Sequence, residues 1–189
     1  FDASRFYGMT FHLDPRAQST DAVCGLQFEK VSGRWYEIAR LPNSREEGLG
    51  KVSLTFEMDG KDKVRISTQG FKNGGRGKRI GLDAVARVPE PGEPAVFKVL
   101  FLGIPVLRYS IVDIDKDDFG TMIVCDHSGE NLWLFARSPD VKREIYDRMV
   151  ATAVSKGFDV SRLIRTPQGE CAVVRKSEEN SRGGHTGGS

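Results

Sequence analysis

Three aspartates that alternate along one short stretch, Asp113, Asp115 and Asp117, are the first candidates for chemistry in this sequence. Carboxylates at this spacing begin a calcium-binding loop, in which alternate residues supply oxygen ligands. Such a loop needs glycine at its sharp turn and a bidentate glutamate at its end, but Asp118 and Val124 occupy those positions. The pattern therefore favours a solvated turn, and we expect no bound metal.

A second candidate is the glycine-rich, basic run from Gly74 to Arg79. Glycines beside a lysine can form a phosphate-binding loop, but this run lacks the spacing and the following Ser or Thr of a P-loop. Strand-like segments flank the run, so the sequence predicts a hairpin turn there. The basic side chains of this region can still attract an anionic head group: Lys72, Arg76, Lys78 and Arg79.

The residues that most often act as nucleophiles or metal ligands are few and dispersed. The histidines lie far apart, at His12, His127 and His185, so the sequence indicates neither a histidine-based triad nor a histidine metal site. The three cysteines permit at most one disulfide bond and show no zinc-binding spacing: Cys24, Cys125 and Cys171. We therefore expect no catalytic residue and no cofactor.

Composition sets limits on the class of protein. The chain has 189 residues, and its 28 Lys and Arg against 26 Asp and Glu give a net charge of only +2. Nucleic-acid binding normally needs a stronger concentration of positive charge. No stretch reaches the roughly 18 apolar residues of a membrane-spanning helix. One domain with a substantial core is the expectation.

The elements that must position these side chains are short strands in which apolar and polar residues alternate. Trp35, Glu37 and Ala39 are expected to share one face of the first strand. Turn residues lie at Asp59–Gly60 and Asn73–Gly74. About eight strands can be marked, near residues 35–39, 52–58, 64–66, 80–88, 97–101, 109–114, 121–125 and 131–137. Even spacing of this kind indicates an antiparallel barrel or sandwich.

A single helix is predicted after the last strand. Ser138–Asp140 is typical of a helix start, and Gly157 of a helix end. Apolar residues recur every four positions between them, at Val141, Ile145, Met149 and Ala153, so the helix can pack against the outside of the barrel. The expected organisation is an irregular N-terminal segment over 1–27, the folded unit over 28–168 and a mostly disordered tail over 169–189.

Two runs, Gly33-Arg34-Trp35-Tyr36-Glu37-Ile38-Ala39-Arg40 and Leu132-Trp133-Leu134-Phe135-Ala136-Arg137-Ser138-Pro139, stand at opposite ends of the strand region. Their order and separation resemble the lipocalin family, in its bacterial and apolipoprotein D-like branch. The run from Gly157 to Ser161 is also similar to the bacterial branch. The resemblance implies an all-β fold: an eight-stranded antiparallel up-and-down β-barrel with one C-terminal α-helix packed outside.

The resemblance also implies roles for signature residues. Trp35, after Gly33, would plug the closed end of the barrel, with Arg137 stacked over it. A guanidinium over an indole face gains roughly 0.5–2 kcal/mol. Asp115 matches the acid of the family's middle signature, although Lys116 stands where Tyr is common.

Alternation along the last strand places Arg137, Phe135 and Trp133 on one face, with Trp133 farthest from the closed end. Trp133 is therefore a candidate ligand contact, although an aromatic side chain on this face can equally be core packing. The same alternatives hold for the other candidate wall residues: Phe56, Leu82, Phe97, Val99 and Tyr109.

The apolipoprotein D-like branch ties its N-terminal segment to the barrel with a disulfide, which maps here onto Cys24 and Cys125. Cys171 would then carry a free thiol. Alternatively, a thiol can be a nucleophile, as in the prostaglandin-isomerising member of the family, but no base stands beside Cys125 or Cys171 in the sequence.

Together these features predict a protein that binds and carries or stores one small hydrophobic ligand, a fatty acid or lysophospholipid, in the barrel calyx. The alternatives are a lipocalin-fold enzyme that isomerises or cyclises an apolar molecule, and a scaffold that acts through its N-terminal segment and helix. Nucleic acid is not expected as a partner, while membrane-surface association and a dimer stay open. A chain beginning at Phe1 fits a processed, exported protein and a truncated chain equally well, and the expected location is periplasmic or outer-membrane-associated.

Overall fold

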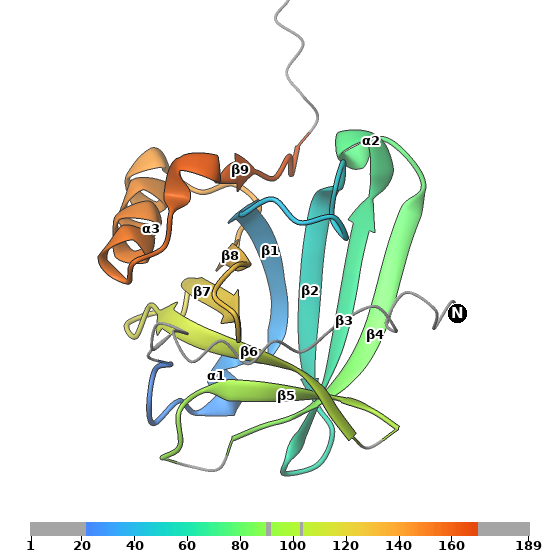
Figure 1. The fold of residues 1–189 in the computed structure, drawn as a ribbon, viewed down its shortest axis with the longest axis vertical. Coiled ribbons are helices and arrows are strands. Elements are labelled where there is room, and N and C mark those ends of the chain that lie inside the picture. The colour runs from blue at the N-terminus through green and yellow to red at the C-terminus, as the bar shows by residue number, and fades with distance from the viewer. Residues whose placement is uncertain (1–21, 90–91, 103, 170–189) are drawn as a thin grey trace, which may run out of the picture.

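A computed structural model describes residues 22–89, 92–102 and 104–169 of the chain. In this part, eight antiparallel strands follow one another around a ring (Figure 1). Strand β1 pairs with both β2 and β8, which closes the ring. The strands are β1 (Gly33–Arg40), β2 (Gly50–Met58), β3 (Lys63–Phe71), β4 (Arg79–Arg87), β5 (Val96–Phe101), β6 (Ile104–Ile114), β7 (Thr121–Asp126) and β8 (Leu132–Ala136). The predicted eight-stranded up-and-down barrel is confirmed.

Alternation along the strands separates an inner face from an outer face. Phe56 of β2 pairs with Ile66 of β3, which pairs with Ala84 of β4, and all three side chains belong to the interior cluster. The turns follow the predicted residues. Between β3 and β4, the short helix α2 (Lys72–Gly75) contains Asn73 at φ 54° and Gly74 at φ 63°, a conformation that Asn and Gly tolerate.

The single long helix of the described chain, α3 (Arg143–Ser155), packs outside the barrel. Its buried residues Met149 and Ala153 contact outward-facing residues of β6 to β8 such as Val112, Ile123 and Leu134. The predicted start at Ser138–Asp140 was wrong, because the Ser138 hydroxyl accepts a hydrogen bond from the Asp140 N–H in a tight turn that precedes the helix. In the described part, no helix is both long and apolar enough to cross a membrane.

Three short elements complete the barrel. Helix α1 (Phe28–Val31) crosses one end of it, where Phe28 and Val31 are buried. After α3, the 3-10 helix η2 (Val160–Arg162) leads to strand β9 (Ile164–Arg165), which pairs with the second half of β1. Of the expected irregular N-terminal segment, residues 22–27 are described, and Val23 donates its N–H to the Ile111 carbonyl. His12, His185 and Cys171 lie outside the described residues.

The turns of an up-and-down barrel alternate between its two ends. The connections at 59–62, 88–95 and 115–120 lie at the end that α1 crosses, the closed end. The connections at 41–49, 72–78 and 127–131, together with Leu102, lie at the opposite, open end. The position of an inward-facing side chain between the closed end and the open end decides whether the side chain is fully enclosed.

Candidate functional site

The closed end is sealed by Trp35, which has no exposed surface. The guanidinium carbon of Arg137 lies 3.9 Å from the centre of the indole ring, and the indole N–H donates to the Val31 carbonyl at 2.7 Å. Arg137 also donates to the carbonyls of Arg34 (3.0 Å) and Lys30 (2.8 Å). The pair therefore joins α1, β1 and the end of β8, as the resemblance implied for this position.

Gly33 has two physical reasons to be glycine. Its φ is 95°, in the left-handed region that L-residues with a side chain avoid. A Cβ at this position would also lie only 3.3 Å from Nη1 of Arg137. The signature glycine thus makes room for the guanidinium that covers Trp35.

A packed aromatic layer shares the interior cluster with Trp35. Phe56 and Phe97 stack with ring centres 5.5 Å apart, and Phe28 contacts Phe97 edge-on at 4.8 Å. The members of this layer are nearly or fully buried, and four of them are predicted ligand contacts: Phe56, Phe97, Val99 and Phe135. The structure places these four in a close-packed floor rather than at an accessible wall.

Nearer the open end, inward-facing side chains become partly exposed. Tyr109 and Trp133 pack edge-on with ring centres 5.7 Å apart, and both are only half-buried. Leu54 and Thr68 form a cross-strand pair, and Thr68 pairs in turn with Leu82, which is 45% exposed. These inner-face side chains therefore differ from the residues around Phe97, because they keep exposed apolar surface.

A β-bulge in β1 introduces charge into the barrel wall. Glu37 pairs with Phe135 and Arg40 with Trp133, so both side chains take the inner face of the strand, while Ala39 packs in the outer cluster. The prediction that Ala39 shares a face with Trp35 and Glu37 was therefore wrong, because the register shifts between Glu37 and Ala39.

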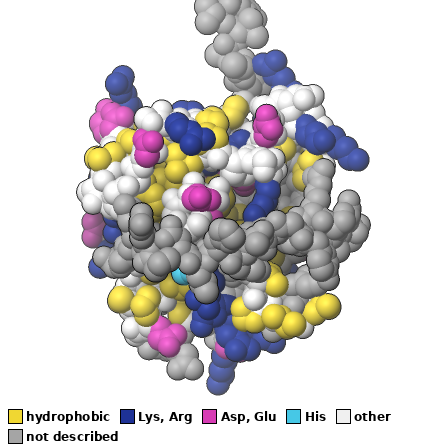
Figure 2. Space-filling model, viewed as in Figure 1, with side chains coloured by type: hydrophobic (Ala, Val, Ile, Leu, Met, Phe, Trp, Pro, Cys, Tyr) yellow, Lys and Arg dark blue, Asp and Glu magenta, His cyan; other side chains and the backbone are white. Residues whose placement is uncertain are grey.

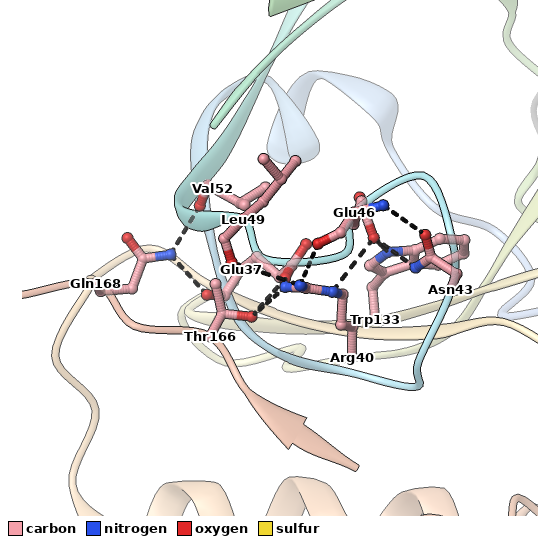
Figure 3. A network of polar contacts seen from close by, with 9 residues as sticks. All are labelled: Glu37, Arg40, Asn43, Glu46, Leu49, Val52, Trp133, Thr166 and Gln168. Carbon is pink, nitrogen blue, oxygen red and sulfur yellow. Dashed lines mark hydrogen bonds and ion pairs between the residues drawn. The ribbon is translucent and has the colours of Figure 1, made fainter. Parts of the chain in front are cut away.

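Glu37 and Arg40 are the centre of a buried polar network (Figure 3). Arg40 Nη1 lies 2.6 Å from Glu37 Oε1 and donates to the Thr166 hydroxyl at 3.1 Å. The Thr166 hydroxyl donates to the same carboxyl oxygen of Glu37. Gln168 donates to the carbonyls of Glu37 (2.7 Å) and Val52 (2.8 Å). Residues 166–168 thereby bridge β1 and β2 where those strands are not paired with each other.

The carboxyl group of Glu37 is electrostatically unusual. Burial raises its pKa from 4.5 to about 7, and the neighbouring carboxylate of Glu46 acts in the same direction, against Arg40 and Thr166. Its second oxygen, Oε2, is buried without a hydrogen-bond partner in the described part of the chain. Near neutral pH, this carboxyl group is therefore close to its point of half-protonation.

The loop at 41–49 is tied to the interior aromatics at the open end. The indole N–H of Trp133 donates to Glu46 Oε2 at 2.8 Å, and the side-chain amide of Asn43 donates to the same oxygen at 2.6 Å. Arg40 Nε lies 3.7 Å from it. Trp133 is thus both a wall residue and an anchor for this loop.

Sequence reasoning missed Glu37, Arg40, Glu46, Thr166 and Gln168 as members of one cluster. One signal was available for the first two. They interrupt an otherwise apolar run that leads away from Trp35, and charged residues are rarely buried unless paired. The partners from the distant 166–168 segment left no such local signal.

A family model described as the lipocalin-like domain matches residues 26–168, which is most of the chain. The chain belongs to the lipocalin family. Outer membrane lipoprotein Blc of Vibrio cholerae is 27% identical to this lipocalin over 151 residues, covering 80% of this chain and 88% of that protein. The protein of the same name from Escherichia coli (strain K12) is 31% identical over 140 residues, covering 74% and 78%.

More distant likenesses agree with this assignment. Apolipoprotein D of Mus musculus is 25% identical to the lipocalin over 174 residues, covering 87% of this chain and 88% of that protein. Insecticyanin from the tobacco hornworm Manduca sexta shares the fold with a TM-score of 0.62 and 16% identity, covering 79% of this chain and 85% of its own.

The remaining predicted sites of this lipocalin are surface turns. Asp115 accepts a hydrogen bond from Arg148 at 3.3 Å, which joins the β6–β7 turn to α3. In the described residues, no group of three or more His, Cys, Asp or Glu side chains is arranged to hold a metal ion. The basic side chains of the β3–β4 turn are exposed at the open end: Lys72, Arg76, Lys78 and Arg79.

The implied disulfide between Cys24 and Cys125 is not formed in the structure. Cys125 is buried in the outer cluster beneath α3, together with Leu132 and Leu134. Cys24 is exposed and lies beside Pro94, next to the start of β5. Cys24 is thus at an exposed position near the start of β5, whereas the side chain of Cys125 is buried between β7 and α3.

Proposed function

We propose that this lipocalin binds one small molecule with an apolar chain in the upper part of the barrel interior. Lipocalins generally bind small hydrophobic ligands. The observation that carries the proposal is the change of burial along the interior. The floor around Phe97 is closely packed, whereas Trp133, Tyr109 and Leu82 keep exposed surface on the inner face.

The energy of binding would come mainly from burying this exposed apolar surface, at about 25 cal/mol per Å². Trp133 and Tyr109 offer large, oriented ring surfaces for an alkyl chain. The floor residues Phe56, Phe97, Val99 and Phe135 would limit how deep the chain reaches rather than lie along it.

A fatty acid or lysophospholipid is the ligand class that suits both parts of the site. Its chain would occupy the apolar upper interior, and its anionic head would lie at the open end, where the exposed basic side chains of the β3–β4 turn gather. The names of the bacterial relatives, outer membrane lipoproteins, support an exported, outer-membrane-associated location in which such lipids are at hand.

Native mass spectrometry of the purified protein tests the proposal. The spectrum should show one bound molecule of palmitic acid or a lysophospholipid per chain, and Trp133→Ala should weaken binding at least about tenfold. Tyr146→Ala is the matched control, because Tyr146 is an aromatic residue of α3 that stacks with Arg165 outside the barrel. The absence of saturable binding in the wild-type protein would refute the proposal.

A further inference from the structure

A row of exposed basic side chains crosses the outer wall of the barrel from β3 to β6. Lys63 pairs with Arg87, Arg87 pairs with Lys98, and Lys98 pairs with Arg108. All of these side chains are exposed, and this row is named the basic ladder. Side chains in such cross-strand pairs start about 5 Å apart, and like charges directly opposite each other destabilise a sheet.

The ladder is not neutralised within the described part of the chain. None of its side chains takes part in the ion pairs found there, which involve Arg40, Arg65, Arg143 and Arg148. Because the whole sequence has a net charge of only +2, the ladder is a local concentration of charge. A concentration of exposed positive charge attracts anionic partners.

Apolar side chains protrude from the same hairpin. Leu102 and Ile104, at the β5–β6 turn, are 88% and 66% exposed, more than any other large hydrophobic residue in the described chain. Figure 2 shows Lys and Arg side chains gathered on the lower part of the molecule, with a band of hydrophobic side chains beside them. The helix α3 packs on β6 to β8, away from β3 to β5 (Figure 1).

We propose that the basic ladder, with Leu102 and Ile104, docks this lipocalin on an anionic lipid bilayer. The ladder would be attracted by anionic head groups, and the two aliphatic side chains would enter the boundary between head groups and acyl chains. Nucleic acid would attract the charges but offer little to exposed aliphatic side chains. Docking goes beyond ligand binding and is independent of it, because Lys98 lies between Phe97 and Val99 and points away from the interior.

Vesicle flotation with the full chain tests docking directly. The wild-type protein should float with vesicles of phosphatidylglycerol and phosphatidylcholine at low ionic strength, should float far less with phosphatidylcholine alone, and should be released by salt. Failure to bind the anionic vesicles would overturn the proposal.

Matched variants separate the ladder from net charge. Lys98→Gln combined with Arg108→Gln should lower partitioning by roughly fivefold for each charge removed. Arg143→Gln combined with Arg162→Gln removes the same charge from exposed positions on α3 and η2 and should have a much smaller effect. Equal losses in the two double variants would contradict a ladder-specific site.

The apolar contribution has its own control. Leu102→Ser combined with Ile104→Ser should reduce vesicle binding about tenfold or more, whereas Val154→Ser, at a residue of α3 that is 53% exposed, should not. Two results would overturn membrane docking and point to a different polyanion. One is ladder-dependent binding to DNA, and the other is ladder-dependent binding to vesicles that is unchanged in the Leu102→Ser, Ile104→Ser variant. Ladder variants should bind palmitic acid as the wild type does, so failure of docking and failure of ligand binding are distinguishable.

Discussion

At the scale of single residues, the carboxyl group of Glu37 is the least expected feature of the barrel wall. It has no exposed surface, one of its oxygens is shared by Arg40 and Thr166, and the other is left without a partner in the described chain. Removing one member of such a network would leave the others buried and unpaired, which is costly. The network is therefore a structural constraint on β1 as well as a source of pH dependence.

The raised pKa of Glu37 predicts the sign of that pH dependence. Because the folded-state pKa, about 7, lies above the ordinary value of 4.5, the stabilising effect is complete below about pH 4.5 and is lost as the pH rises through 7. A pKa shift of this size changes the free energy of unfolding by about 3 kcal/mol. Urea unfolding at about pH 5 and about pH 8 should show the loss in the wild type and a much flatter profile in Glu37→Gln. Parallel profiles for the two proteins would contradict this assignment.

Gly33 permits a test of the contact with Arg137. Gly33→Ala should destabilise the fold by about 1–2 kcal/mol from its positive φ, with an added cost from the close approach to the guanidinium. Gly129→Ala is the control, because Gly129 has a φ of 74° and no atom within 4 Å of an added Cβ. Thermal unfolding of both variants should show the larger decrease in melting temperature for Gly33→Ala. Equal decreases would mean that the contact with Arg137 is unimportant.

At the scale of elements, the loop at 41–49 and the segment at 166–168 both hold β1 in place through side-chain contacts. Glu46 holds the loop to Trp133 and lies near Arg40, while Thr166 and Gln168 connect β1 with β2. The loop and the segment both contact Arg40, the ion-pair partner of Glu37. Because the carboxylate of Glu46 also raises the pKa of Glu37, the charge state of Glu37 is coupled to the loop at the open end.

Removing the Glu46 charge tests this coupling. Glu46→Gln should shift the midpoint of the pH-dependent stability to lower pH, because the carboxylate of Glu46 helps to raise the pKa of Glu37. The measurement is urea unfolding across the pH range, with Glu47→Gln, an exposed neighbour in the same loop, as control. An unchanged midpoint in Glu46→Gln would show that the loop does not act on Glu37.

The sequence predicts the elements well for a physical reason. Inward-facing side chains such as Phe56 and Ile66 must be apolar, and this requirement makes the period of a strand visible in the chain. The bulge after Glu37 leaves no such pattern, so the inner position of Arg40 could not be predicted.

The candidate site was only partly predictable. Alternation identified the inner face of β8, including Trp133 and Phe135, but the height of a residue in the barrel depends on how α1 fills the closed end. The sequence therefore could not separate floor residues such as Phe97 from upper wall residues. The position of Cys125 beneath α3 likewise depends on tertiary register.

At the scale of the whole molecule, the barrel has an interior core and a second core beneath α3, and its sheet has an inner and an outer face. The interior core seals the closed end and leaves the upper wall partly exposed, while the second core joins β6 to β8 with α3. Among the described residues, α3 does not extend over the outer wall from β3 to β5, and this part of the wall carries three of the four ladder residues. Ligand binding is thus assigned to the inner face of the sheet, and membrane docking to the outer face of β3 to β6 together with Leu102 and Ile104 at the β5–β6 turn.

The central claim, an apolar ligand beside Trp133 and above the packed floor, is tested most directly by a nitroxide-labelled fatty acid that quenches tryptophan fluorescence. The chain has two tryptophans, Trp35 in the sealed floor and Trp133 in the upper wall. We predict saturable quenching in the wild type that is largely lost in Trp133→Phe, whose remaining emission comes from Trp35. Quenching that persists undiminished in Trp133→Phe, or that never saturates in the wild type, would contradict the account.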